Sequence, residues 1–280
     1  MQQEDKTTVE AATAAYKEEK AKEDFQVVNS KSNRLFIILA GFFIANSLIA
    51  EFIGVKIFQF ESTIGSEEIW NWELFGIQGS FQFTAGVLLW PIVFIMTDII
   101  NEYFGKRGVK FLSTLAAGLI AYSFLAIYGA IQLNAADWWI TSGDKAGIPD
   151  MQAAFSSIFG QGLWIIVGSI AAFFIGQVVD VMVFHRIKQV TGEKYIWLRA
   201  TGSTLISQFI DSFVVLYIAF VLSGSWTYEQ WIAIGLINYL YKFLLALVLT
   251  PILYIVHVII DKYLGKELSE KMRLSAMEQP

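Results

Sequence analysis

One stretch of the chain decides its class: Leu163-Trp-Ile-Ile-Val-Gly-Ser-Ile-Ala-Ala-Phe-Phe-Ile-Gly-Gln-Val-Val-Asp-Val-Met-Val-Phe184. It is apolar along almost its whole length, and about 20 apolar residues are enough to cross a bilayer as an α-helix. Gln177 and Asp180 interrupt it. An ionisable side chain inside a membrane span is costly, and it normally faces other helices or a watery cavity. The stretch therefore predicts a membrane helix whose polar face is directed into a bundle.

Other stretches of the chain reach the same length. Apolar residues make up 55% of the chain, and the scarce charged residues are concentrated in the segments between the apolar stretches. We therefore expect an all-α integral membrane protein with six transmembrane helices. The predicted spans are Leu35–Val55, Phe81–Ile100, Phe111–Leu133, Leu163–Phe184, Gly202–Leu222, and Ile232 to about Tyr254, the last within a longer helix that ends near Ile260.

Lysine and arginine residues fall in alternate connections, and short cytoplasmic loops carry the positive excess in membrane proteins. Basic residues precede the first span, follow the second, fourth and sixth spans, and are almost absent elsewhere. The remaining connections, 61–80, 134–162 and 223–231, contain one basic residue, Lys145. Both termini are therefore predicted to be cytoplasmic.

The ends of the chain differ in composition from its middle. Residues 1–31 are rich in Glu, Lys, Ala and Thr, so we expect a flexible polar cytoplasmic tail. They lack the apolar core and the cleavage site of a signal peptide. Residues 32–262 form the predicted six-helix transmembrane domain, and residues 263–280 form a short cytoplasmic tail.

Composition argues against several classes of function. The formal net charge is −5, and topology explains the basic residues, so we expect no nucleic-acid partner. Cysteine is absent, which excludes disulfides, thiolate nucleophiles and cysteine metal sites. His185 and His257 are far apart in sequence, and no catalytic or metal-binding motif is recognisable. We therefore expect neither an enzyme nor a bound cofactor or metal.

Two neighbouring spans carry the same polar insert, Gln177 with Asp180 and Gln208 with Asp211. Each pair has i, i+3 spacing, which places both side chains on one face of a helix. At about 1.5 Å of rise per residue, both glutamines lie roughly 10 Å from the cytoplasmic ends of their spans. The repeated insert predicts a solute-binding site between the two helices. The alternative is interhelical hydrogen bonding alone, which is worth about 0.6 kcal/mol per contact.

Further polar residues lie within the predicted spans. Lys242, near the midplane of the sixth span, cannot reach water easily and should face a carboxylate or a solute. Asp98 follows Pro91 in the second span. A proline can interrupt a helix, and interrupted helices often line transporter sites. Alternatively, Pro91 only kinks the helix, and Asp98 caps it or pairs with nearby loop lysines. Asn46 is a weaker candidate because a lone asparagine often serves packing. Glu51 could pair with a nearby lysine at the outer surface.

Four fragments occur in order along the chain: Thr97-Asp98-Ile-Ile-Asn-Glu-Tyr-Phe-Gly105, Gly176-Gln-Val-Val-Asp180-Val-Met-Val-Phe184, Trp197-Leu-Arg199-Ala-Thr-Gly-Ser203-Thr204-Leu-Ile-Ser-Gln208-Phe-Ile-Asp211, and Tyr241-Lys242. Together they resemble the queuosine precursor transporters, also called the putative vitamin uptake transporter family. The resemblance runs from about Leu35 to Ile260, with matching order and spacing.

This resemblance implies import of a 7-deazaguanine base, with a cyano or aminomethyl group, or of queuine, across the bacterial cytoplasmic (inner) membrane for tRNA modification. A guanine-like edge has adjacent N–H donors beside a carbonyl, which a carboxylate and a neighbouring amide or ammonium can satisfy together. Aromatic side chains can stack on the ring. The predicted substrate-binding residues are Asp98, Gln177, Asp180, Gln208, Asp211, Lys242 and Asn46, with Trp90, Phe209, Tyr239 and Tyr241 as stacking candidates.

The sequence is compatible with two energy sources. No phosphate-binding loop occurs, so we do not expect the chain to hydrolyse ATP, whereas its buried carboxylates suggest proton-coupled transport as a hypothesis. The alternative is a membrane-embedded capture subunit for another small planar, vitamin-like solute, working with a separate ATPase. The expected partners are the small-molecule substrate and the lipid bilayer, and a homo-oligomer remains open.

Overall fold

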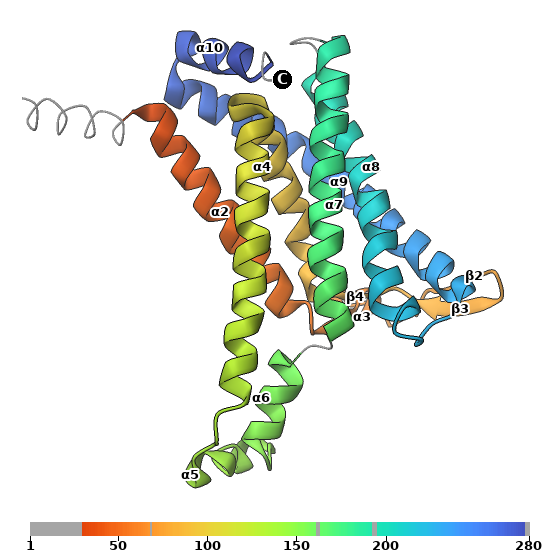
Figure 1. Ribbon diagram of the computed structural model, residues 1–280. Coiled ribbons are helices and arrows are strands. Elements are labelled where there is room, and N and C mark those ends of the chain that lie inside the picture. The colour runs from red at the N-terminus through yellow and green to blue at the C-terminus, as the bar shows by residue number, and fades with distance from the viewer. Residues whose placement is uncertain (1–29, 68, 161–162, 192–194, 278–280) are drawn as a thin grey trace, which may run out of the picture.

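The computed structural model describes residues 30–67, 69–160, 163–191 and 195–277. The predicted tail, residues 1–31, lies almost entirely outside the described residues. Long helices run alongside one another, with short β strands near one end of the bundle and helix α10 at the other (Figure 1). We call these the strand end and the α10 end.

Within the described residues, five helical segments are long and apolar enough to cross a membrane. They correspond to α2 (Lys31–Ile53), η1 with α4 (Ala85–Leu88 and Trp90–Ile131), α6 with α7 (Met151–Phe159 and Leu163–Thr191), α8 (Ile196–Leu216) from Thr201 onward with the π-helix η3 (Tyr217–Val221), and α9 (Tyr228–Leu264). Large apolar side chains such as Leu125 and Val248 remain exposed on the outer faces of these helices, as lipid-facing positions do. The protein is thus a helical membrane protein.

Helix α4 consists of two arms, residues 90–104 and 106–131, that fold back at Gly105. Gly105 has φ 69° and ψ −172°, a conformation that favours glycine. The hydroxyl groups of Thr97 and Ser113 donate to the same side-chain oxygen of Gln177, at 3.0 and 3.2 Å. On one straight helix the two hydroxyls would be roughly 24 Å apart. The arms therefore lie side by side (Figure 1), and they correspond to the second and third predicted spans.

The prediction that a spanning helix begins at Phe81 is wrong. Residues 82–84 form strand β4 (Gln82–Thr84), which pairs with β1 (Ile57–Gln59), and α4 begins only at Trp90. The alternation Phe-Gln-Phe-Thr is a strand pattern that the wider apolar window concealed. Pro91 consequently lies in the first turn of α4, where a missing N–H costs nothing, and it does not interrupt the helix as predicted.

Short elements fill the connections at the strand end, so the described residues are not entirely α-helical. Strands β2 (Asn71–Leu74) and β3 (Ile77–Ser80) form a second antiparallel pair. Their two-residue turn, Phe75-Gly76, has positive φ at both positions, as a type I′ hairpin requires. The other short elements are α3 (Phe60–Thr63), α5 (Asp137–Ile140) and η2 (Asp144–Ala146).

The end of the chain is more structured than a tail. Helix α9 starts with a capping box between Thr227 and Gln230, and continues to Leu264. After Gly265, α10 (Lys266–Met277) contacts α4, α7 and α9. The apolar core lies among α2, both arms of α4, α7 and α9. Helix α10 therefore covers one end of this packed bundle.

Candidate functional site

An ion pair between α8 and α9 is the centre of the candidate site. The Lys242 Nζ lies 2.6 Å from the Asp211 Oδ2, and the two side chains are 9% and 17% exposed. The structure thus places a carboxylate beside Lys242, one of the two partners that the sequence suggested. Desolvating two charges offsets much of their attraction, so a buried ion pair is weak evidence for a stabilising role.

Both members of the pair line a cavity of about 590 Å³, which we call the large cavity. This volume falls within the range of about 300–1,000 Å³ that is typical of small-molecule sites. The lining includes the exposed residues Val55 and Thr84, so the cavity reaches the surface at the strand end. Its other polar lining side chains include Glu51, Gln78, Gln82, Ser169, Ser212, Gln230 and Asn238. Its aromatic lining side chains are Trp72, Phe83, Trp90, Phe220 and Trp226.

Small residues bring α7 close to the helix that carries Asp211. A Cβ atom at Gly168 would lie 3.0 Å from the carbonyl oxygen of Val215, so only glycine fits without a shift. A Cβ atom at Gly176 would lie 3.6 Å from the Cβ of Asp211, which is ordinary contact. Close packing of this kind is common where membrane helices meet at small residues. It fixes the position of Asp211 at the cavity wall.

A second, small cavity of about 20 Å³ is also lined by Lys242. Asp98, Gln208 and Lys242 line it, and Lys242 is the residue that lines both cavities. About 10–15 Å³ suffices for one water molecule, so this cavity is far too small for a planar base. Asp98 accepts hydrogen bonds from Thr204 at 3.2 Å and from Ser203 at 3.5 Å. It does not pair with the loop lysines among the described contacts.

The other polar insert, Gln177 with Asp180, lies in a buried layer between α4, α7 and α8. The Gln177 oxygen receives the two hydroxyl hydrogen bonds from α4, and the Asp180 Oδ1 accepts from Ser207 at 3.1 Å. Among the described residues, the Gln177 Nε2, the Asp180 Oδ2 and both amide atoms of Gln208 are buried without a hydrogen-bond partner. Side-chain hydrogen bonds therefore join α7 to α4 and α8 in this layer.

The predicted stacking residues divide into two groups. Trp90 lines the large cavity directly. Tyr241 lies behind Phe83, with ring centroids 4.3 Å apart. Phe209 and Tyr239 contact each other edge to face at 5.1 Å and line neither cavity. Trp90 is therefore the one predicted stacking residue that reaches the large cavity.

Asn46 also lies away from both cavities. Its amide nitrogen donates to the backbone oxygen of Phe42, one helical turn earlier, at 2.8 Å. The structure instead brings Glu51, which the sequence suggested would pair with a lysine, to the cavity wall, where it accepts a hydrogen bond from Ser169. The signal that could have found Glu51 was an ionisable residue within a predicted span.

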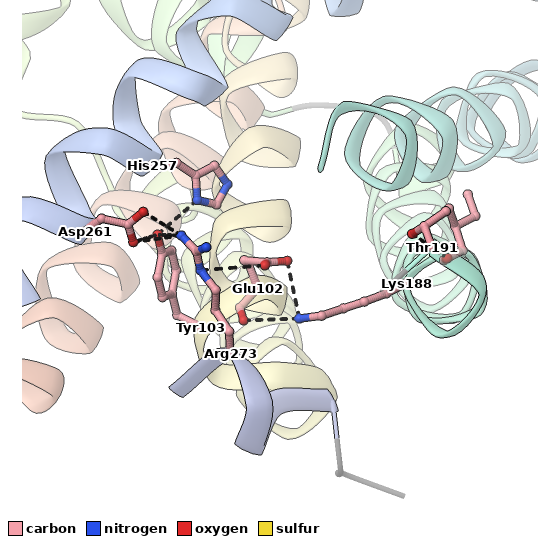
Figure 2. A network of polar contacts seen from close by, with 8 residues as sticks. Glu102, Tyr103, Lys188, Thr191, His257, Asp261 and Arg273 are labelled. Atoms are coloured by element: carbon pink, nitrogen blue, oxygen red, sulfur yellow. Dashed lines mark hydrogen bonds and ion pairs between the residues drawn. The ribbon is translucent and has the colours of Figure 1, made fainter. Parts of the chain in front are cut away.

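A second network of charged groups lies at the α10 end (Figure 2). The Lys188 Nζ of α7 lies 3.3 Å from the Glu102 Oε2 of α4, and each side chain is 1% exposed. The Arg273 Nε of α10 lies 3.8 Å from the other Glu102 oxygen. Glu102 thus joins three helices through two cations.

Arg273 extends this network to α9. Its Nη2 lies 2.7 Å from each Asp261 carboxylate oxygen and 3.0 Å from the Tyr103 hydroxyl. Tyr103 in turn donates to Asp261 at 2.8 Å and contacts the His257 Nδ1 at 3.0 Å. Burial opposes the charge of Arg273, but the hydrogen bond to Tyr103 and the Asp261 and Glu102 charges raise its pKa above the usual value. The network therefore holds α10 over this end of the bundle with a permanent cation.

The chain matches a family model described as "Putative vitamin uptake transporter" over residues 84–256. The chain belongs to this family. The match covers both arms of α4, α7, α8 and most of α9, and therefore every member of the two polar inserts and Lys242. The protein is thus a multi-pass membrane protein of a transporter family. No solved structure matches the chain.

Three relatives extend this result. A "Probable queuosine precursor transporter" of Bacillus subtilis is 29% identical over 183 residues, 65% of this chain and 73% of the relative. A protein of the same name from Haemophilus influenzae is 27% identical over 177 residues, 61% and 66% of the two chains. The "Queuosine precursor transporter" of Escherichia coli is 28% identical over 202 residues, 71% and 81%.

Proposed function

We propose that this protein imports a queuosine precursor, a 7-deazaguanine base or queuine, across the bacterial inner membrane. The observation that carries the proposal is the Asp211–Lys242 ion pair on the wall of a 590 Å³ cavity. The names of the three relatives support the same substrate. The volume suits a planar bicyclic base, and the aromatic lining suits its faces.

The ion pair supplies both the hydrogen-bond acceptor and the hydrogen-bond donor that a guanine-like edge requires. The Asp211 carboxylate can accept the two adjacent N–H groups of a guanine-like edge, and the Lys242 ammonium can donate to the carbonyl beside them. Trp90 lines the same cavity and can stack on the ring. Because Asp211 and Lys242 already lie within 2.6 Å of each other, the two groups are held side by side before the substrate arrives.

The transmembrane arrangement that we propose has six passes, with both termini in the cytoplasm. The two arms of α4 count as two passes, and α2, α7, α8 and α9 supply the others. The turn of α4 at the α10 end carries Lys106, Arg107 and Lys110, and α10 itself carries three further basic residues. Positive charge favours the cytoplasmic side. The large cavity therefore opens to the exterior in this arrangement.

The structure corresponds to an outward-open state in this proposal. The large cavity reaches the surface at the strand end, while the Glu102 network and α10 cover the opposite end. To be released inside, the substrate must pass Lys242 and reach the layer that contains Gln208 and Asp98. Opening that route requires the contacts between α10, α4 and α7 to separate, as alternating access demands.

Uptake of labelled bases by liposomes that contain only this purified chain tests the proposal. We expect saturable uptake of queuine or of a 7-deazaguanine precursor, with guanine as the control for specificity. Absence of uptake of any of these bases would contradict the proposed function. Uptake that appears only when an ATPase component is added would favour the capture-subunit alternative.

Proton coupling is a separate part of the proposal, supported by the buried carboxylates Asp98 and Asp180. We expect an inward proton gradient to accelerate uptake in the same liposomes. Uptake that is indifferent to an imposed pH gradient would remove proton coupling while leaving substrate transport intact.

A further inference from the structure

Helix α10 is joined to the bundle through a single glycine. Helix α9 ends at Leu264 and α10 begins at Lys266, so Gly265 alone separates the two helices. Its φ of 87° and ψ of 154° form a conformation that favours glycine, and a Cβ atom there would meet nothing within 4 Å. Because the junction is short and uncrowded, a change of the backbone angles at Gly265 can turn α10 relative to α9.

The inner side of α10 rests on the apolar core of the bundle. Leu268 and Met272 of α10 pack against this core, which includes Leu253 and Leu264 of α9. Leu253 also lines the small cavity that contains Lys242. The same core therefore borders the small cavity and carries α10.

The polar contacts that hold α10 down are partly exposed. Arg273 and Ser269 of α10 both donate to the Asp261 carboxylate of α9. The side chains of Arg273 and Asp261 are 15% and 39% exposed, whereas those of Glu102 and Lys188 are 1% exposed each. Water can solvate Arg273 and Asp261 when they separate, so this pair opens at a lower cost than the buried pair below it.

We propose that α10 is an inner gate, hinged at Gly265 and latched by Arg273. This inference rests on the proposed function, in which the substrate leaves at the α10 end. In this structure Arg273 ties α10 to Asp261 of α9 and to Tyr103 of α4, so the gate is closed (Figure 2). For release, Arg273 leaves both groups and α10 turns about Gly265.

A cross-link across the hinge tests the gate. Ser269 donates a hydrogen bond to Asp261, and both side chains are short, so cysteines at these two positions lie within reach of a short bifunctional maleimide. The chain has no cysteine of its own. In liposomes, we expect the reagent to lower uptake by the double variant Ser269→Cys with Asp261→Cys at least about tenfold, because a fixed lid blocks turnover.

Two controls accompany the cross-link. Each single-cysteine variant, treated with the same reagent, shows the effect of modification without a bridge and should keep its uptake. Binding of the base to the cross-linked protein, measured by thermal shift, should persist, because the large cavity lies at the strand end. Undiminished uptake by the cross-linked protein would overturn the gate.

A second measurement tests the latch without a cross-link. Arg273→Gln removes the cation that joins α10 to α9 and α4, so we expect amide hydrogens of α10 to exchange about tenfold faster or more. The control is Lys271→Gln, at an exposed position of the same helix, which should exchange as the wild type does. Unchanged exchange in Arg273→Gln would overturn the latch, also where the double-cysteine variant does not fold.

The outcomes separate this inference from the proposed function. Failure of the wild-type chain to take up any base would contradict the proposed function and the gate together. Normal uptake by the wild type, with undiminished uptake after cross-linking, would overturn the gate and leave the proposed function standing.

Discussion

The large cavity and the α10 end both contain buried ion pairs, but the surroundings of these pairs differ. Asp211 and Lys242 lie on a cavity wall, where a solute can reach them. Glu102 and Lys188 are each 1% exposed and are tied to Arg273 of a third helix. The difference teaches that oppositely charged side chains can lie on a cavity wall, where a solute can contact them, or in close packing between helices, where it cannot. Our proposal assigns substrate binding to the first pair and helix packing to the second.

This contrast extends to the hydrogen bonds around each pair. At the α10 end, Arg273 donates to Asp261 and to Tyr103, and Tyr103 donates to Asp261, so side chains of α4, α9 and α10 are bound to one another (Figure 2). On the wall of the large cavity, by contrast, polar side chains such as Asp211, Lys242 and Asn238 face space that a solute can occupy. Side chains bound to one another across helices favour one arrangement of those helices, whereas polar groups on a cavity wall can exchange partners with a solute. We therefore expect mutations in the two regions to have different consequences.

The largest effect should follow Asp211→Asn. This change removes the acceptor for the base and leaves the Lys242 ammonium buried without its counter-charge. We expect uptake to fall by more than about 100-fold, because both losses act on the same bound state. Uptake in vesicles, normalised to the amount of protein in the membrane, measures the effect.

Asp180→Asn, in the buried layer, should also abolish uptake. Normal transport by both the Asp211→Asn and the Asp180→Asn variants would show that the inserts are structural.

The double variant Asp211→Asn with Lys242→Met sharpens this prediction. If the pair binds substrate, the double variant should remain inactive although the charge imbalance is gone. Restored uptake would show a structural ion pair like that of Glu102 and Lys188, and the comparison between the two regions would fail.

The second-largest effect should follow Lys188→Met at the α10 end. We expect this variant to lower the stability of the folded protein. Glu102 would lose a buried ion-pair partner, and removing one partner of a buried pair typically costs about 3–5 kcal/mol. We expect a clear drop in the melting temperature of the purified protein. The control is Lys110→Met, an exposed lysine near the same end, which should change little. An unchanged melting temperature in Lys188→Met would show that the network does not hold this end together.

A smaller effect should follow Gly86→Ala, which perturbs the cavity wall without changing a charge. The added Cβ would lie 2.5 Å from the Ala50 oxygen, so η1 and α2 must separate. Overpacking typically costs about 1–3 kcal/mol, and the displaced Glu51 should lower uptake several-fold. Gly118→Ala, where nothing lies within 4 Å, is the matched control. Equal behaviour of the two variants would argue against close packing at Gly86.

The smallest effect should follow Asn46→Ala. Asn46 bonds to its own helix and lines neither cavity. We expect uptake within about twofold of the wild type, because the lost bond lies within a single helix turn. Loss of uptake would place a functional polar group outside the cavity that we assign, and would require a different site.

The sequence predicted the features that depend on local hydrophobicity. The apolar stretches became long helices, and Lys242 lies beside a carboxylate, because the membrane imposes both constraints on any sequence. The sequence also predicted two separate apolar spans in the region that forms α4. These spans fall on the two arms of α4, which join at Gly105. In these cases the bilayer, rather than tertiary packing, determines where the helices form and that a buried charge is paired.

The remaining features depend on long-range packing. The strand pairing of Gln82–Thr84 needs β1, and the position of Glu51 on the cavity wall needs η1 and α7 to be in place. Likewise, Arg273 meets Glu102 only because α10 folds back over the bundle. A single sequence gives no measure of which distant segments meet, so residues 263–280 were predicted as a tail although most of them form α10.

Protection of a single cysteine tests most directly whether the large cavity holds the base. The chain contains no cysteine, so Asn238→Cys introduces a unique thiol on the cavity lining, and Ser225→Cys places one on an exposed loop at the same end. We predict that an aminomethyl 7-deazaguanine slows the reaction of the first thiol with a membrane-impermeant maleimide and leaves the second unaffected. Equal labelling of Asn238→Cys with and without a transported base would contradict the assignment of the large cavity as the substrate site.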